Sequence, residues 1–112
     1  MTENKNFKNP LVSKVKDIVQ SAPAVIFMKG TPQFPQCGFS SRACQVLKTV
    51  GVKDLVGIDV LSDDALWDAL EEFTEWPTVP QIFIHGKFVG GCDIICEMFE
   101  RGELETLLKQ PA

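Results

Sequence analysis

Residues 24–40 read AVIFMKGTPQFPQCGFS and carry most of the information about how this 112-residue chain folds. The first five, Ala24–Met28, form a short apolar run with high β-propensity, which predicts a buried strand. A turn-rich segment continues to Gln36. Cys37 then stands directly before a stripe of apolar residues at helical spacing, and the stripe ends at Gly51. The segment therefore predicts a strand, a loop and a helix with a cysteine at the helix N-terminus.

The same kinds of pattern extend to both sides of this segment. In chain order we expect a helix opened by Asn9-Pro10, a strand Leu55–Val60, a helix capped at Ser62-Asp63-Asp64, a hairpin of Gln81–Ile84 and Lys87–Val89 around His85-Gly86, a helix with Asp93 as its N-cap, and a last helix after Gly102. The order α-β-α-β-α-β-β-α-α combines a parallel crossover with an antiparallel hairpin. We therefore predict an α/β, thioredoxin-like fold, with a four-stranded mixed sheet and helices on both faces.

The composition is that of one ordinary globular domain, with 45% hydrophobic and 23% charged residues. The apolar run Ala24–Met28 is far shorter than the ~20 residues that span a bilayer, so we expect no membrane association. The net charge is −4 and no basic cluster is present, which argues against nucleic acid as a partner. We expect residues 1–8 to be a flexible N-terminal segment.

The sequence Cys37-Gly38-Phe39-Ser40 is the candidate reactive site. Backbone N–H groups at a helix N-terminus favour a thiolate over a thiol, and this makes the cysteine nucleophilic and able to bind metals. A redox C-x-x-C motif has a second cysteine three residues later, where this chain has Ser40, so the site has a single thiol. The alternative is a buried, inert cysteine, but Gly38 and the turn residues before Cys37 favour an exposed thiol.

Four motifs resemble those of the monothiol, Cys-Gly-Phe-Ser-type glutaredoxins. They are Met28–Pro32 (MKGTP), Cys37–Ser40 (CGFS), Trp76–Gln81 (WPTVPQ) and Gly90–Ile94 (GGCDI). The match in order and spacing runs from about Leu11 to Leu108. The resemblance implies that residues 9–112 form a single glutaredoxin domain, with a groove for glutathione and with Cys37 as the reactive residue.

The resemblance also assigns roles to individual residues around that groove. Lys29 would pair with a carboxylate of glutathione. Val79 would offer its N–H and C=O to the peptide of glutathione from a cis Val79-Pro80 bond, although a trans proline at a strand start is the common alternative. Cys92 and Asp93 would receive the γ-glutamyl end at a helix N-terminus, although Asp93 alone is explained as an N-cap.

Trp67 is a departure from the family pattern. It stands where the family usually has an arginine that reaches the glycine carboxylate of glutathione. Loss of a charge-assisted hydrogen bond costs on the order of 1–3 kcal/mol, so we expect weaker glutathione binding unless another cation compensates. The other tryptophan, Trp76, is expected to pack in support of the cis-proline loop.

The remaining cysteines are less informative. Cys44 lies near the apolar stripe and is expected to be a small core residue. The i, i+4 spacing of Cys92 and Cys96 suggests half of a zinc site, but a structural zinc site usually has four ligands and His85 is the only histidine. The fold implies that Cys92 and Cys37 line one groove, which would let them form a disulfide on oxidation.

The resemblance implies a carrier of a labile 2Fe-2S cluster. One exposed cysteine supplies only one of the four ligands that a cluster needs, so two chains and two glutathione molecules would complete the set in a homodimer. The implied role is iron–sulfur cluster assembly and transfer, with BolA-type proteins and iron–sulfur acceptor proteins as partners. Cys37 would be the catalytic residue and the metal ligand.

Two other functions stay open at this point. One is a glutathione-dependent thiol-disulfide oxidoreductase that removes glutathione from mixed disulfides through Cys37, with weak activity at most because no resolving cysteine stands at position 40. The other is a glutathione-binding redox sensor without a cluster. The expected location is the cytoplasm, or alternatively the mitochondrial matrix after removal of a presequence.

Overall fold

The computed structural model describes residues 7–110. Most of the predicted flexible segment 1–8 lies outside the described residues, so its flexibility stays a prediction. The elements are α1 (Val12–Val19), β1 (Ala24–Met28), α2 (Gly38–Thr49), β2 (Val56–Asp59), a 3-10 turn η2 (Val60–Ser62), α3 (Asp64–Thr74), β3 (Gln81–Ile84), β4 (Lys87–Gly90), α4 (Cys92–Glu100) and α5 (Glu103–Lys109).

The four strands form one mixed sheet in the order β2-β1-β3-β4. Strand β1 is parallel to β2, as the crossover through α2 requires, and antiparallel to β3. Strands β3 and β4 form an antiparallel hairpin. Its turn residues His85 and Gly86 have φ of 52° and 80°, the left-handed conformation that a two-residue hairpin turn uses. The predicted fold class is confirmed.

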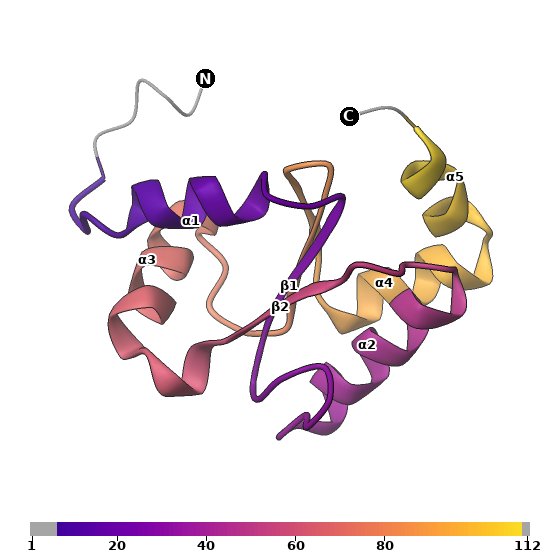
Figure 1. Ribbon diagram of the computed structural model, residues 1–112, viewed down its shortest axis with the longest axis horizontal. Coiled ribbons are helices and arrows are strands. Elements are labelled where there is room, and N and C mark those ends of the chain that lie inside the picture. The colour runs from indigo at the N-terminus through magenta and orange to yellow at the C-terminus, as the bar shows by residue number, and fades with distance from the viewer. Residues whose placement is uncertain (1–6, 111–112) are drawn as a thin grey trace.

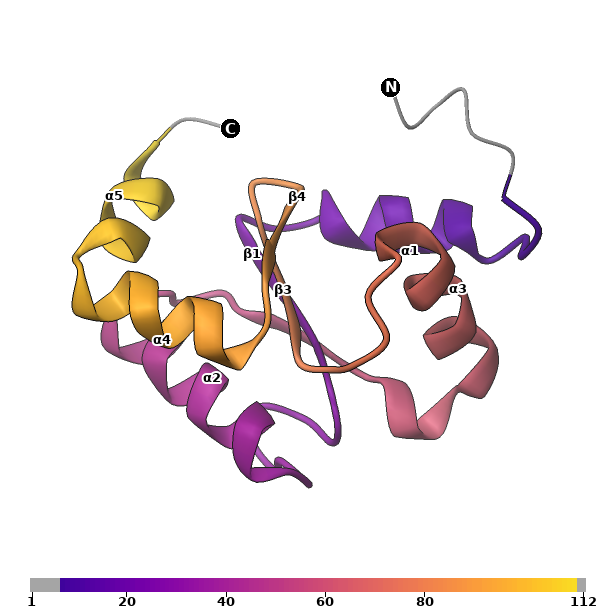
Figure 2. The same ribbon diagram turned by 180° about the vertical axis from the view of Figure 1, so that it is seen from behind.

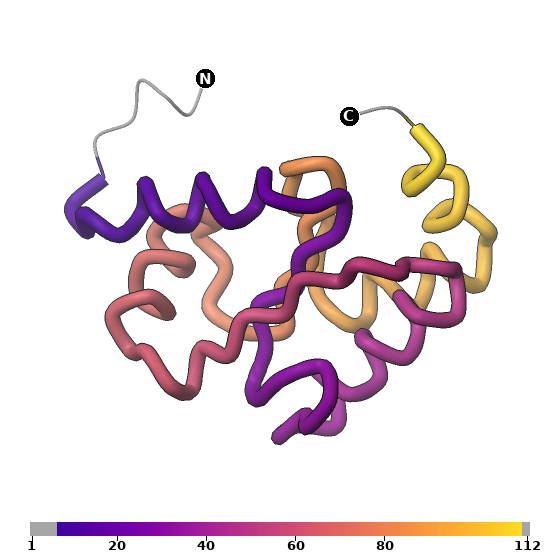
Figure 3. Tube along the Cα trace, in the orientation of Figure 1, coloured from indigo at the N-terminus to yellow at the C-terminus, as the bar shows by residue number. Residues whose placement is uncertain are grey.

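The helices cover the sheet in two layers (Figure 1). Helices α1 and α3 pack together on one face, and α2, α4 and α5 lie on the other. The view from behind shows the same division, with the hairpin of β3 and β4 between the two groups (Figure 2). Each time the chain passes from a helix of one layer to a helix of the other, it runs along one or more strands of the sheet (Figure 3).

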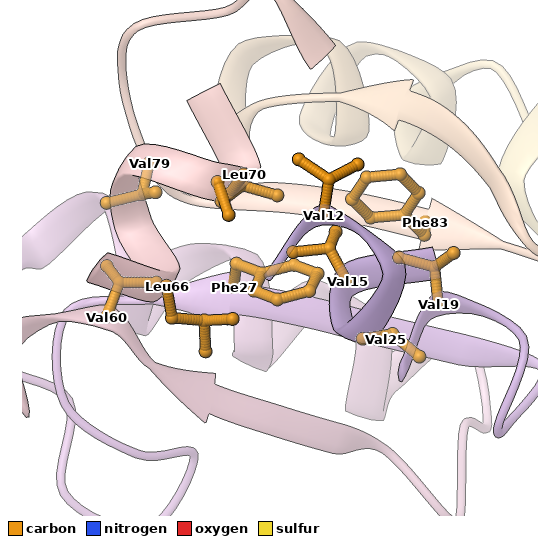
Figure 4. Packing of buried hydrophobic residues seen from close by; sticks show 11 residues of the cluster. Val12, Val15, Val19, Val25, Phe27, Val60, Leu66, Leu70, Val79 and Phe83 are labelled. Atoms are coloured by element: carbon orange, nitrogen blue, oxygen red, sulfur yellow. The ribbon is translucent and has the colours of Figure 1, made fainter. Parts of the chain in front are cut away.

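The core is correspondingly divided into two clusters by the sheet. Successive side chains of a strand point to opposite faces, so Val25 and Phe27 of β1 join the cluster under α1 and α3, while Ile26 and Met28 join the other. Every residue of β1 is buried, which explains its continuous apolar sequence. Figure 4 shows the first cluster, in which the ring of Phe27 meets Phe83 edge-on with centroids 5.6 Å apart.

The helix starts agree only in part with the sequence. The prediction that Asn9-Pro10 opens the first helix is wrong by two residues, because the N-cap of α1 is Leu11 and the helix begins at Val12. Asn9 Oδ1 accepts a hydrogen bond from the Leu11 N–H at 2.9 Å in the turn that precedes the helix. Asp63 Oδ1 accepts from the Leu66 N–H at 3.0 Å and caps α3 as predicted. The prediction for α4 is wrong, and its correction is described with the site below. Within residues 7–110, no helix combines the length and the apolar character needed to cross a membrane.

Candidate functional site

A groove of about 430 Å³ lies where the ends of several elements converge. Strand β1 ends beside the start of β3 because the two are antiparallel, and α2 and α4 begin at the same edge. The groove is lined by Lys29, Cys37, Phe39, Trp67, Trp76, Pro77, Thr78, Val79, Pro80, Gly91, Cys92, Asp93 and Ile94. All five predicted site residues (Lys29, Cys37, Val79, Cys92 and Asp93) are therefore brought together, and the volume suits a small-molecule ligand.

Cys37 is the N-cap of α2 and is partly exposed. Its thiol does not make a regular N-cap hydrogen bond. The backbone N–H of Ser40 nevertheless lies near the sulfur and has the largest effect in lowering the pKa of the thiol. The N–H of Phe39, the positive charge of Lys29 and the Ser40 hydroxyl lower this pKa further, against a partial opposing effect of burial. The thiol is accessible and its thiolate is favoured, which are the properties of a nucleophile or metal ligand.

We predict that the rate of alkylation of Cys37 by iodoacetamide, measured as a function of pH, has its midpoint at a lower pH than the rate for free cysteine. The thiolate is the reacting form, so a lowered pKa moves the rise of the rate toward acidic pH. Peptide mapping by mass spectrometry assigns the rate to Cys37 among the four thiols. Lys29→Gln should raise the midpoint only slightly, because the Ser40 amide has the larger effect. A midpoint at or above that of free cysteine would contradict the geometry.

The loop before Cys37 is held in place by two polar side chains. The Lys29 N–H donates to the buried Ser40 Oγ at 3.3 Å, which ties the end of β1 to the first turn of α2. The Gly30 N–H donates to Asp59 Oδ1 at 3.0 Å, and the same oxygen accepts from Leu61 at 2.9 Å. Ser40 therefore has a structural role at the position that a second cysteine has in dithiol sites.

The Val79-Pro80 peptide bond is cis, as the resemblance predicted. Gln81, which is fully buried, holds the loop before it: its Nε2 donates to the carbonyl oxygens of Trp76 at 2.9 Å and Thr78 at 3.1 Å. Among the hydrogen bonds of residues 7–110, none uses the backbone N–H or C=O of Val79. An extended peptide in the groove would find this donor and acceptor available.

Trp76 is more exposed than a residue that packs in support of the cis-proline loop is expected to be. Its carbonyl oxygen accepts the hydrogen bond from Gln81 that holds this loop, but the residue is 45% exposed and lines the groove. The indole lies 6.2 Å from the ring of Phe88 between centroids. The side chain therefore forms a wall of the groove.

The start of α4 corrects a second prediction. The N-cap is Gly91, in an extended conformation, and the helix begins at Cys92, so Asp93 is the second helical residue and not the N-cap. Asp93 is exposed in the first turn, where a carboxylate interacts favourably with the helix dipole. The first N–H groups of α4 and the Asp93 carboxylate are thus both at the groove.

The thiol of Cys92 differs from that of Cys37 in its electrostatics. Desolvation, together with the contact to Cys96, raises the pKa of Cys92 to about 11. Its sulfur lies 3.9 Å from that of Cys96, whose sulfur accepts a hydrogen bond from Arg42 Nε at 3.3 Å. Cys44 is buried, as predicted for a core residue, and burial raises the pKa of its thiol. The groove therefore contains one activated thiol, Cys37, and one protonated thiol, Cys92.

Trp67 lines the groove from α3, and its Nε1 is buried without a hydrogen-bond partner. The indole packs against the core cluster under α1 and α3. Lys29 is the only basic side chain that lines the groove within residues 7–110. No second cation of the described groove therefore takes the place of the arginine that the resemblance leads us to expect at position 67.

Sequence reasoning did not identify Ser40, Asp59 or Gln81 as residues that build the site. Ser40 and Asp59 each accept a hydrogen bond from a backbone N–H just after β1, and Gln81 donates to backbone carbonyls of the loop before β3. A signal was present for Gln81, since a polar residue within a strand sequence of otherwise apolar residues requires partners when it is buried. Nothing in the sequence indicated that Asp59 reaches Gly30.

Comparison with known proteins adds independent information. A family model for glutaredoxin matches residues 24–89. The mitochondrial monothiol glutaredoxin-5 of Lachancea kluyveri is 46% identical over 97 residues, which cover 85% of this chain and 68% of that protein. The probable monothiol glutaredoxin 2 of Rickettsia typhi is 43% identical over 109 residues, which cover 97% of this chain and 93% of the relative.

Solved structures give the same result. The solution structure of reduced apo GrxS14 from poplar superposes with a TM-score of 0.78 at 40% identity, covering 88% of this chain and 90% of that one. The crystal structure of a buckwheat glutaredoxin–glutathione complex superposes with a TM-score of 0.76 at 33% identity, covering 87% and 86% of the two chains. Similarity of sequence and of fold thus extends over most of the chain.

Proposed function

The chain belongs to the glutaredoxin family, and on that premise we propose that it binds glutathione and a labile 2Fe-2S cluster bridging a homodimer, and acts in iron–sulfur cluster assembly and transfer. The observation that carries this proposal is a single accessible, activated thiol, Cys37, beside a peptide-sized groove, with a buried structural serine at position 40. Such a site lacks the second thiol that a dithiol redox cycle uses.

Three features of the groove support glutathione as its ligand. The ammonium group of Lys29 suits a carboxylate, and the free N–H and C=O of Val79 suit an extended peptide. The start of α4 suits the γ-glutamyl end, because its first amides attract a carboxylate and Asp93 attracts an ammonium group. A related buckwheat glutaredoxin has been crystallised as a complex with glutathione.

The donor set explains why the cluster would be shared. A 2Fe-2S cluster needs four thiolates, two on each iron, and each chain would supply one from Cys37. Two chains and two glutathione thiols complete the set. Because glutathione dissociates, such a cluster is labile cargo that the protein passes to acceptors. We propose BolA-type proteins and iron–sulfur acceptor proteins as the partners.

The alternative function is weak thiol-disulfide exchange through Cys37, in which its thiolate attacks a glutathione mixed disulfide and a second glutathione or Cys92 completes the turnover. The high pKa of Cys92, about 11, makes its thiol a slow resolving group at neutral pH. The proposed location is the cytoplasm or the mitochondrial matrix. The relatives include a yeast mitochondrial protein and a bacterial one.

The test is anaerobic reconstitution with iron, sulfide and glutathione, followed by the visible spectrum and the size in solution. We expect a coloured species of dimer size. Mercaptoethanol at the same thiol concentration is the control, because it offers a thiol without the groups that fit the groove, and it should give little colour. A colourless monomer with glutathione would overturn the carrier function. Turnover of a glutathionylated peptide would then support the oxidoreductase.

We predict that Trp67→Arg binds glutathione more tightly, by about 5- to 150-fold, because a charge-assisted hydrogen bond contributes roughly 1–3 kcal/mol. Isothermal titration of the reduced chain measures the change. Ala65→Arg is the matched control, since it adds the same charge to α3 at an exposed position outside the groove lining. If Trp67→Arg and the parent chain have equal affinities for glutathione, the prediction that Trp67 weakens binding is wrong.

A further inference from the structure

The proposed function does not use the contact between the thiols of Cys92 and Cys96. The two residues are four apart on α4, so their side chains lie on the same face of the helix in consecutive turns. Their sulfurs are 3.9 Å apart. Both thiols are free, and Cys96 is partly exposed, which gives the pair access to solvent.

The separation of the two sulfurs matches that of two thiolates on one metal ion. With metal–sulfur bonds of about 2.3 Å, the two sulfurs stand about 3.8 Å apart at a tetrahedral angle and about 4.6 Å apart in a linear arrangement. The observed 3.9 Å is close to the tetrahedral value. A linear arrangement requires the two sulfurs to move apart by about 0.7 Å through rotation of the two side chains.

The number and type of ligands select the class of metal. Within residues 7–110, no group of three or more histidine, cysteine, aspartate or glutamate side chains is placed to hold a metal ion. A structural zinc site, which usually has four protein ligands, is therefore not formed by these residues. Two thiolates alone suit a soft cation such as Cu(I), which prefers sulfur ligands and accepts a low coordination number.

The neighbouring charge favours a monovalent ion. Helices α2 and α4 lie side by side (Figure 2), and Arg42 of α2 donates a hydrogen bond from Nε to the Cys96 sulfur at 3.3 Å. Two thiolates and one monovalent cation carry a net charge of −1, which the guanidinium balances. A divalent ion would neutralise the two thiolates by itself, so the guanidinium would have no net negative charge to balance.

We propose that Cys92 and Cys96 form a two-thiolate site for a soft monovalent cation, with Arg42 as its charge-balancing neighbour. On binding, each thiol releases its proton to the solvent and its sulfur coordinates the ion. The site shares Cys92 with the groove but does not use the thiol of Cys37, so the proposal needs neither bound glutathione nor an iron–sulfur cluster.

The test uses Cu(I), delivered anaerobically to the reduced chain in a buffer without added small-molecule thiols, in competition with the chromophoric chelator bathocuproine disulfonate. We expect the parent chain to take one Cu(I) from the chelator. Cys96→Ser should lower the affinity by more than about 100-fold, since even residues that only support metal ligands typically account for 10–100-fold. Arg42→Gln should lower it by about 10-fold.

Cys37→Ser is the matched control, because it removes a thiol from the same groove and leaves the pair intact. Its copper affinity should equal that of the parent chain. If Cys37→Ser loses copper, or if Cys96→Ser keeps it, the ion is bound elsewhere and the proposal is wrong. If Zn(II) binds the pair as tightly as Cu(I), the assignment to a soft monovalent cation is wrong.

Discussion

Cys37→Ser should give no visible colour and no dimer-sized species after reconstitution with iron, sulfide and glutathione. A serine hydroxyl stays protonated at neutral pH and does not replace the thiolate that the first turn of α2 favours. Each chain would lose its one protein ligand, and a cluster shared by two chains would lose two of its four thiolates. The absorbance of the mixture should fall to that of iron, sulfide and glutathione without protein.

The matched control for this experiment is Cys96→Ser. It removes a partly exposed thiol outside the residues that line the groove, so its spectrum and size after reconstitution should equal those of the parent chain. Colour that persists in Cys37→Ser and disappears in Cys96→Ser would reverse the assignment and place the cluster on α4. Thermal unfolding of both variants shows whether the fold is kept.

Gly30→Ala should destabilise the chain by about 3 kcal/mol, through backbone strain and overpacking together. Gly30 has φ of +86°, and a Cβ there would lie 2.4 Å from the Phe34 carbonyl oxygen and 2.7 Å from the Gln36 nitrogen. Both contacts are with backbone, which has little freedom to move because the Gln36 N–H donates to the Lys29 carbonyl at 2.9 Å. Calorimetry should show a Tm lower by roughly 10–20 °C.

The control is Gly51→Ala, at a glycine with φ of +97° and no atoms near the added Cβ. This variant carries the cost of the left-handed conformation without the clash, about 1 kcal/mol. The difference between the two variants in the free energy of unfolding therefore measures the steric clash of the added methyl group with the loop before Cys37. If both variants lose the same stability, the loop accommodates the methyl group and the steric argument fails.

Local patterns were sufficient to predict most of the fold. The sequence of β1 is uniformly apolar because the strand is buried on both faces, and this is visible without a structure. The hairpin turn at His85-Gly86 was also predictable from local sequence, because a glycine in a short polar segment between two apolar runs favours the left-handed backbone of a two-residue turn. The motif resemblance then predicted the cis bond before Pro80, which composition and periodicity leave open.

The errors occurred where tertiary contacts determine the outcome. Asp93 is a stronger N-cap than glycine by propensity, yet the chain turns into α4 two residues earlier, at Gly91. The exposure of Trp76 depends on how the loop before β3 is held, and Gln81 holds it from within the core. The hydrogen bond from Gly30 to Asp59 joins residues that are distant in sequence, so no local pattern indicates it.

The position of the groove between the two helical layers has a consequence for cooperativity. Trp67 belongs to the layer of α1 and α3, whereas Cys37 and Cys92 belong to the opposite layer. A ligand that contacts residues of both layers would bind only when both layers are folded. At a concentration 100 times its Kd, it would raise the free energy of unfolding of the whole chain by about 2.7 kcal/mol. Amide hydrogen exchange should then slow in both layers at once, including amides that are remote from the ligand.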